Sequence, residues 1–155
     1  MAENNDKLIY DIVSDCYHEE QKTTTDLDSK AGSVTRIAGL LATLTAAVVG
    51  YMPKGPYQLL FVIPIILLII SAIVGLRALW IQSYTSIDPE EVIKRYHDKT
   101  STETLRRYTT TISYNTMDNS RVNFRRAGQI KSAFTLLIVS ISLFFVIVII
   151  NWIMR

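Results

Sequence analysis

Three long runs of apolar residues interrupt an otherwise polar chain. They extend over roughly Ile37–Met52, Tyr57–Gln82 and Ala133–Met154. A helix needs about 20 apolar residues to cross the hydrocarbon core of a bilayer, at a rise of about 1.5 Å per residue. The second and third runs carry no charge deep within them. The pattern therefore predicts an all-α integral membrane protein with three transmembrane helices.

The polar segments on either side of the first two runs are also predicted to be helical. In the N-terminal segment, Leu8, Ile12 and Cys16 recur at helical spacing, with Ile9 and Val13 beside them. We expect this helix to continue into the first span. Asp26 and Lys30 stand four residues apart with the acid first, the favoured order for an ion pair within a helix. Lys30 is therefore expected to pair with Asp26, or with a carboxylate on a neighbouring helix.

A second polar segment separates the second and third runs. The sequence Asp88-Pro89-Glu90-Glu91 is a strong helix start, with a capping acid and a proline at the first helical position. A further helix is predicted to begin near Glu103 and to run without a proline into the third span. One face of this helix is marked by these residues: Leu105, Tyr108, Ile112, Asn115, Asn119, Val122 and Arg126.

These elements predict one domain in four parts. The parts are an N-terminal helix at 1–35, a transmembrane hairpin at 36–82, a helical segment at 83–132 and a third span at 133–155. The turn Pro53-Lys54-Gly55-Pro56 is expected to close the hairpin. Pro64 removes a helical hydrogen bond, so a kink is expected within the second span.

Lysines and arginines predict the orientation of the spans. With three spans, the N-terminus and residues 83–132 lie on one side, and most basic residues fall there. They include Lys22, Lys30, Arg36, Arg77, Lys94, Arg95, Lys99, Arg106, Arg107, Arg121, Arg125, Arg126 and Lys131, against Lys54 and Arg155 on the other side. The positive-inside rule then places the N-terminus and residues 83–132 in the cytoplasm. The first residues lack the basic and apolar regions of a signal peptide, so the first span is expected to be retained.

No catalytic constellation is recognised, so an enzyme is not expected. His18 and His97 lie far apart, and neither begins a metal-binding spacing. No glycine-rich phosphate loop or nucleophile elbow is present, and no cofactor or metal is predicted. Cys16 is the single cysteine, interpreted as a half-buried structural thiol. The net charge of +2 is too small to indicate a nucleic-acid partner.

Polar and basic residues before the third span form the candidate ligand site. They are Asn115, Asn119, Arg121, Arg125 and Arg126. Buried asparagines are normally hydrogen-bonded, so the simpler interpretation is local bonding to the N-terminal helix, and the alternative is a ligand pocket. The arginines, together with Lys131, are best explained by contact with anionic lipid headgroups. The alternative is a site for a nucleotide phosphate.

Small residues recur every four positions in the first span, at Ala38, Ala42, Ala46 and Gly50. Such a stripe lets membrane helices approach closely. It could join copies of the chain in a homo-oligomer or seat the other spans within one monomer. Thr43 and Thr45 could add hydroxyls facing a pore or a neighbouring helix.

The sequence Asp28-Ser29-Lys30-Ala31-Gly32 resembles the Asp-x-Lys-Ala signature of the PycTM-like family, the transmembrane effectors of Pycsar defence systems. The stretch from Asn115 through Asn119 and Arg125-Arg126 to Lys131 is similar to that family's last helix. The related SLATT proteins are also small membrane effectors. The resemblance covers roughly Thr25–Arg155.

The resemblance implies an anti-phage effector in the inner (plasma) membrane of a prokaryote. Such an effector responds to a nucleotide messenger and impairs the membrane by oligomerisation and permeabilisation. This chain shows no cyclic-nucleotide-binding domain, so the ligand could belong to a sensor partner chain. The alternative is a non-catalytic accessory subunit of a larger membrane complex, which its composition fits equally well.

Overall fold

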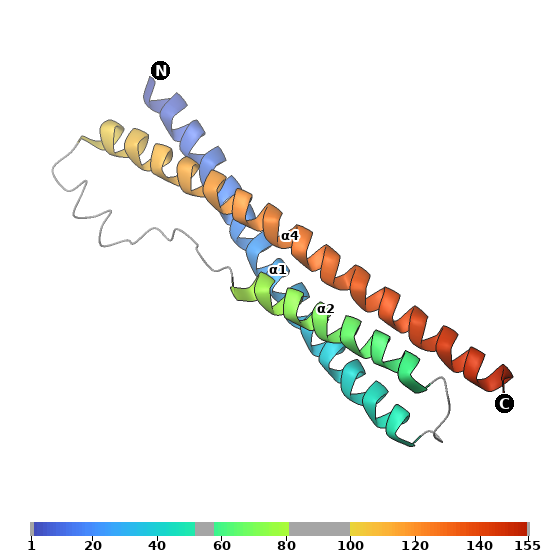
Figure 1. Ribbon diagram of the computed structural model, residues 1–155. Coiled ribbons are helices and arrows are strands. Elements are labelled where there is room, and N and C mark those ends of the chain that lie inside the picture. The colour runs from blue at the N-terminus through green and yellow to red at the C-terminus, as the bar shows by residue number, and fades with distance from the viewer. Residues whose placement is uncertain (1, 52–57, 81–99, 155) are drawn as a thin grey trace. The chain divides into compact units, whose positions relative to one another are not determined.

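The computed structural model describes residues 2–51, 58–80 and 100–154, and these are almost entirely helical. The elements are α1 (Ala2–Tyr51), a 3₁₀ turn η1 (Gln58–Phe61), α2 (Val62–Trp80) and α4 (Ser101–Ile153) (Figure 1). Three of these helices are long and apolar enough to cross a membrane. The prediction of three such helices is therefore confirmed.

Two of the helices continue far beyond their apolar runs. α1 has 50 residues and α4 has 53, so the predicted continuations into the first and third spans are confirmed. α4 begins two residues before the predicted Glu103, and the amide of Thr104 donates to the carbonyl of Thr100 at 2.9 Å. The predicted helix at residues 88–96 and the turn at residues 53–56 lie outside the described residues.

Pro64 does not interrupt a long helix as expected. It is the third residue of α2, and α2 follows η1 directly. The first amides of a helix have no helical acceptor, so a proline in this turn removes no α-helical hydrogen bond. The predicted kink within the second span is thus replaced by a change from 3₁₀ to α-helix at its start.

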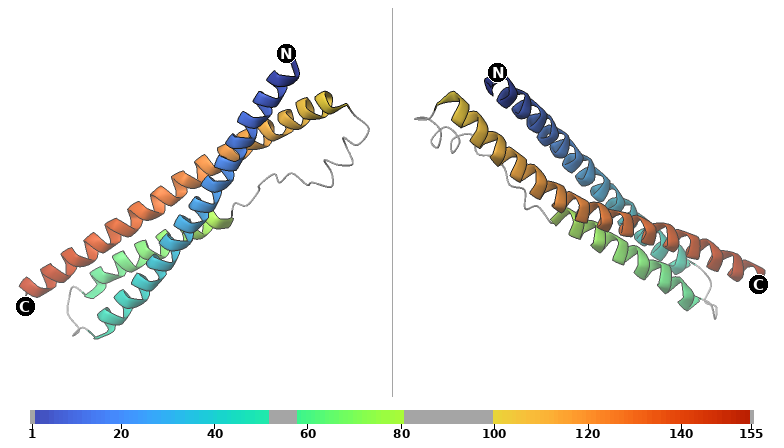
Figure 2. Two further views of the ribbon diagram at one scale, coloured as in Figure 1. Left: turned by 180° about the vertical axis from the view of Figure 1, so that it is seen from behind. Right: turned by 90° about the horizontal axis from the view of Figure 1, so that it is seen from above.

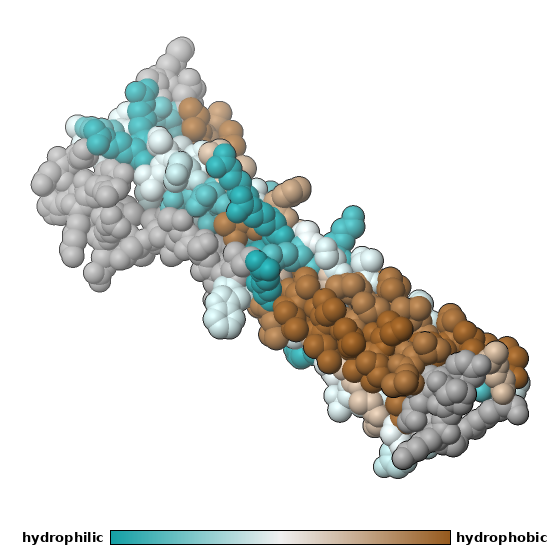
Figure 3. Space-filling view, viewed as in Figure 1, coloured by the Kyte–Doolittle hydropathy of each residue, from teal (hydrophilic) through white to brown (hydrophobic). Residues whose placement is uncertain are grey.

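The chain divides into two compact units. The polar unit combines residues 1–26 with 82–125, and the apolar unit combines residues 27–81 with 126–155. Hydrophobic residues gather on the surface of the apolar unit (Figure 3). Bulky side chains there are outward-facing, among them Leu40 at 63% and Ile73 at 57% exposed. A water-soluble domain rarely exposes so much apolar surface, whereas a bilayer favours it.

In the apolar unit, α1, α2 and α4 lie side by side (Figures 1 and 2). α1 and α4 run parallel and α2 runs antiparallel to both. The core is made of small and aliphatic side chains, in clusters that include Leu27, Ala31, Ala78 and Ile130, and Val34, Ala38, Ala133 and Leu137. Small residues at these positions let three backbones approach closely, which supplies the packing that holds helices together in lipid.

Buried and half-buried positions of α1 and α4 form a seven-residue repeat within each unit. On α1 they are Asp6, Tyr10, Val13, Tyr17, Glu20, Thr24, Leu27, Ala31, Val34, Ala38, Leu41 and Thr45. On α4 they are Thr109, Ile112, Thr116, Asn119, Asn123, Arg126, Ile130, Ala133, Leu137, Ser140, Phe144 and Ile147. Alternating steps of three and four are typical of a coiled coil. The repeat is mostly polar in the polar unit and mostly apolar in the other.

Candidate functional site

A buried arginine joins all three helices of the apolar unit. Arg126 on α4 is fully buried, at 0% exposed. Its Nε donates a 2.8 Å hydrogen bond to the carbonyl oxygen of Ala78 on α2. Its guanidinium also forms an ion pair and hydrogen bond with the carboxylate of Asp28 on α1. We call this arrangement the Arg126 clamp.

The local structure explains why an arginine is placed there. The Ala78 carbonyl is among the last four of α2 as the structure describes it, so no amide within Val62–Trp80 donates to it. A cation at a helix C-terminus also interacts favourably with the helix dipole. Burying a charge is costly unless it is paired and hydrogen-bonded, and Asp28 supplies the opposite charge. The Asp28 side chain itself keeps 37% of its surface exposed.

The polar unit is held by hydrogen bonds where a coiled coil usually has aliphatic side chains. The Nδ2 of Asn123 donates to Glu20 Oε1 at 2.6 Å and to Thr24 Oγ1 at 2.9 Å. Asn115 and Asn119 are buried on the same face of α4. An asparagine bond to the N-terminal helix is therefore present at Asn123, a residue that was not predicted, whereas the bonds expected of Asn115 and Asn119 stay predictions.

Two further contacts join α1 and α4 in the polar unit, further from Asn123. The Nε of Arg106 donates to Asp6, with the nearer oxygen at 3.2 Å. The rings of Tyr10 and Tyr108 stack with centroids 6.0 Å apart. Burial raises the pKa of the Tyr108 phenol, and the neighbouring phenols of Tyr10 and Tyr17 raise it further. The Tyr108 side chain is thus neutral at physiological pH.

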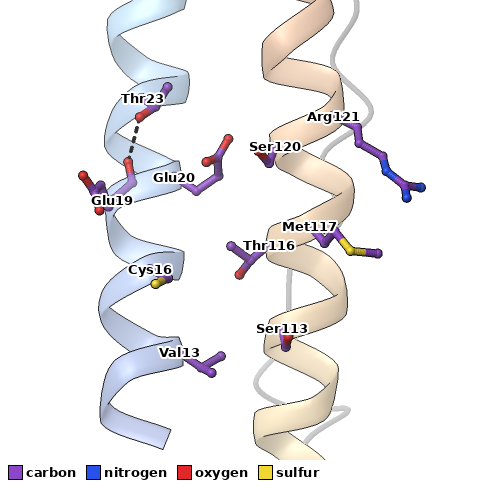
Figure 4. Close-up of a pocket in the computed structure, with 10 residues that line it drawn as sticks. All are labelled: Val13, Cys16, Glu19, Glu20, Thr23, Ser113, Thr116, Met117, Ser120 and Arg121. Atoms are coloured by element: carbon purple, nitrogen blue, oxygen red, sulfur yellow. Dashed lines mark hydrogen bonds between the residues drawn. The ribbon is translucent and has the colours of Figure 1, made fainter. Parts of the chain in front are cut away.

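A groove of about 620 Å³ lies between α1 and α4 within the polar unit (Figure 4). Its lining is mostly polar: Val13, Cys16, Glu19, Glu20, Thr23, Ser113, Thr116, Met117, Ser120 and Arg121. Glu20 and Thr116 point towards the opposite helix, whereas the guanidinium of Arg121 is directed away from α1 (Figure 4). With two carboxylates and one arginine, the lining is acidic, which disfavours a strongly anionic ligand.

The three predicted arginines do not form one basic site. Arg121 and Arg125 are exposed in the polar unit, and Arg126 is buried in the apolar unit. Successive residues of a helix are about 100° apart, so adjacent arginines at 125 and 126 point in different directions. Only Arg121 lines the groove.

Signature residues of the family resemblance are partly brought together. Asp28 meets Arg126, but Lys30 is exposed and has no ion pair with any residue that the structure describes. The pairing expected for Lys30, with Asp26 or with a carboxylate on a neighbouring helix, is therefore not found among the described residues.

Along the small-residue stripe of α1, the residues become progressively more exposed. Ala38 is fully buried, Ala42 is half-buried, and Ala46 and Gly50 are exposed. Steps of four residues turn about 40° further than a full helical turn, so a strict four-residue stripe drifts away from a seven-residue repeat. Thr45 is buried instead, while the hydroxyl of Thr43 donates to the Gly39 carbonyl of its own helix at 2.8 Å.

The apolar stripe predicted for the N-terminal helix faces outward. Leu8, Ile9 and Ile12 are 59%, 51% and 55% exposed, and Cys16 is exposed rather than half-buried as expected. The buried Asp6 and the half-buried Glu20 lie on the side of α1 that contacts α4 instead. Sequence reasoning assumed that aliphatic side chains mark the interface, and here the interface is polar.

No cluster of three or more histidine, cysteine or acidic side chains suited to a metal ion occurs within residues 2–51, 58–80 and 100–154.

In comparisons with known proteins, no family model, curated protein or solved structure matches this chain.

Proposed function

We propose that this protein is a membrane effector that acts as a homo-oligomer and permeabilises the membrane when its helices rearrange. The observation that carries this proposal is the inverted polarity of the first part of α1. Leu8, Ile9 and Ile12 face outward while the seam with α4 is polar. A helix in water normally buries such aliphatic side chains, so this stripe is an association surface.

The same proposal accounts for the exposed end of the small-residue stripe. Ala46 and Gly50 offer a smooth surface on the apolar unit, where close helix approach drives association in lipid. Two separate surfaces of α1, one in each unit, would then contact neighbouring copies. Association through both surfaces would link a rearrangement of the polar unit to a change in how the spans pack.

The Arg126 clamp is the proposed switch. α1 and α4 both contribute to each unit, and Asp28 and Arg126 are among the first residues of these helices in the apolar unit. If α1 and α4 separate there, a charge buried among three helices loses its carboxylate. Such a charge recruits water into the bundle, which would favour an open or leaky arrangement.

We propose that a nucleotide messenger, if it is the signal, is sensed by a partner chain. The groove in the polar unit is lined by Glu19 and Glu20 as well as Arg121, so it repels an anionic phosphate more than it attracts one. The proposed location is the inner (plasma) membrane, with the N-terminus and residues 83–132 in the cytoplasm, as the positive-inside rule indicates. Labelling of cysteines placed at positions 7 and 107 should need permeabilised cells, and labelling at position 54 should not.

A dye-release assay tests the effector proposal. The full-length protein is reconstituted in liposomes loaded with carboxyfluorescein, alone and with cyclic mononucleotides. Wild-type protein is expected to release little dye, and Asp28→Asn is expected to release several-fold more. Glu103→Gln, which removes an exposed ion pair within α4, is the control and should behave as wild type. Equal release from all three proteins would reject the clamp as a switch.

The exposed apolar stripe at the start of α1 also favours a second candidate function, that of an accessory subunit in a larger membrane complex. In that case Leu8, Ile9 and Ile12 would contact a different protein. Cross-linking of the purified protein in nanodiscs separates the two functions. Cross-links between copies that disappear in Leu8→Gln/Ile12→Gln support the effector. A strictly monomeric protein supports the subunit.

A further inference from the structure

We infer that the apolar unit carries a binding site for an anionic phospholipid in a second groove between α1 and α4. This groove has a volume of about 730 Å³, and no residue of α2 lines it. It therefore lies on the side of the helix pair that α2 leaves uncovered. The inference rests on membrane residence alone, and it stands or falls independently of the effector role.

Two lysines line the groove, one from each helix. Lys30 of α1 and Lys131 of α4 both line it, and both are exposed. Neither has an ion-pair partner among the residues that the structure describes. Asp28 and Arg126 meet at the same level, so the two lysines, two and five residues further on, start within about 5 Å of each other along the helix axes.

The rest of the groove is suited to an acyl chain. Val34, Ile37, Ile130 and Phe134 provide an aliphatic and aromatic wall, and Phe134 is 50% exposed. Ile37 lies seven residues beyond Lys30, which is about 10 Å along a helix. The groove thus combines two cations with an apolar slot, the two kinds of group that a phospholipid headgroup and its acyl chain would contact.

Charge complementarity favours an anionic lipid over a neutral one. No aspartate or glutamate lines this groove, in contrast to the groove of the polar unit. Basic pockets between membrane helices near the surface are typical sites for anionic headgroups. A free phosphate shares the headgroup chemistry but cannot use the apolar wall, so the occupant we infer is the lipid.

Native mass spectrometry of the delipidated full-length protein in detergent tests the site. Dioleoyl-phosphatidylglycerol, dioleoyl-phosphatidylcholine and inorganic phosphate are titrated separately. We expect phosphatidylglycerol to bind about tenfold or more tightly than phosphatidylcholine, since each nearby lysine strengthens binding to anionic lipid. Equal binding of the two lipids would overturn the inference, as would displacement of the lipid by phosphate at equal concentration. These comparisons use the unaltered protein.

Lysine variants then locate the site. Lys30→Gln/Lys131→Gln is expected to reduce binding of phosphatidylglycerol to the level of phosphatidylcholine, and Lys30→Arg/Lys131→Arg should retain it. The matched control is Lys7→Gln/Lys22→Gln, which removes the same charge from exposed positions of the polar unit. Similar losses in both glutamine pairs would show general charge attraction and reject this groove. Circular dichroism verifies that each variant keeps its helix content.

Discussion

The hydroxyl of Ser71 on α2 donates a 2.7 Å hydrogen bond to the main-chain carbonyl oxygen of Ala133 on α4. The return contact lies seven residues further along α4 and seven residues back along α2. There, Ser140 donates to the carbonyl of Pro64, also at 2.7 Å. Both serines are fully buried. The two bonds therefore fix the register of α2 against α4 within an otherwise apolar interface.

Replacing either serine with alanine should lower the free energy of unfolding only modestly. Hydrogen bonds between membrane helices contribute about 0.6 kcal/mol on average and up to about 1.7 kcal/mol. The two losses should add, because the sites share no partner. Denaturation in mixed micelles measures the effect. Ser132→Ala is the control, since the exposed Ser132 hydroxyl donates to the Gly128 carbonyl of its own helix, and it should be neutral. A larger loss in the control than in Ser71→Ala would contradict the register argument.

Asp28→Asn should destabilise the apolar unit by about 3 kcal/mol. This is the lower end of the range for a broken buried pair, because the Asp28 side chain remains 37% exposed. The loss arises because the Arg126 charge stays buried without that carboxylate. Glu103→Gln removes an exposed pair of 3.0 Å and should cost no more than about 0.5 kcal/mol.

The double variant Asp28→Leu/Arg126→Met tests whether the loss in Asp28→Asn comes from the remaining Arg126 charge. Removing both charges eliminates the buried cation that has lost the Asp28 carboxylate, so at least half of the lost stability should return. Unfolding in mixed micelles compares the single and double variants. A double variant less stable than Asp28→Asn would show that the hydrogen bond to Ala78 outweighs the ion pair.

The sequence predicted the helices well and their contacts poorly. Long apolar runs and the absence of proline were sufficient to predict α1 and α4 as continuous helices. The polar repeat through Glu20, Thr24 and Asn123 was not recognised, because hydrophobic periodicity is the usual signal for an interface. The seven-residue spacing of the polar residues Thr109, Thr116 and Asn123 could have indicated it.

For the candidate site, too, the sequence indicated residues but not their contacts. Asp28 and Arg126 were both selected from the sequence, but their pairing spans 98 residues and no local pattern encodes it. Arg121, Arg125 and Arg126 were grouped because they are close in sequence. Helical geometry then separated Arg126 from the others, with the partner on α1 deciding which arginine turns inward.

Gly75 of α2 should not tolerate a larger side chain. A Cβ at this position would overlap the hydroxyl of Thr35 on α1, which itself bonds to the Ala31 carbonyl at 2.9 Å. Overpacking of this kind costs about 1–3 kcal/mol. Gly75→Ala should therefore lower stability, and adding Thr35→Ala should restore most of it. Gly128→Ala meets nothing within 4 Å and should be neutral or slightly stabilising, by up to about 1 kcal/mol.

Ala38 and Ala46 should respond differently to leucine, although both belong to the four-residue stripe. Ala38 is 0% exposed, so Ala38→Leu should destabilise the monomer by about 1–3 kcal/mol. Ala46 is exposed, so Ala46→Leu should leave the monomer intact and weaken any contact between copies. Light scattering in nanodiscs and unfolding in mixed micelles measure the two effects separately.

The exposed Ala47 gives a matched control for the second variant, since it lies beside the stripe but outside it. Ala47→Leu should change neither association nor stability. If Ala46→Leu and Ala47→Leu weaken association equally, the contact does not depend on the small residues.

The pairing of α1 with α4 has a consequence for the order of events on the ribosome. Its polar side-chain contacts join residues far apart in a chain of 155. The separation is 98 positions for Arg126 with Asp28 and 103 positions for Asn123 with Glu20. α1 is synthesised long before α4, so Asp6, Glu20 and Asp28 have no α4 partners while α2 is being made. Closing so long a loop comes late and is slow compared with helix formation. A nascent chain stopped before residue 126 would hold two apolar helices but neither the Arg126 clamp nor its register, and translation of the last helix becomes the step that commits the protein to its assembled state.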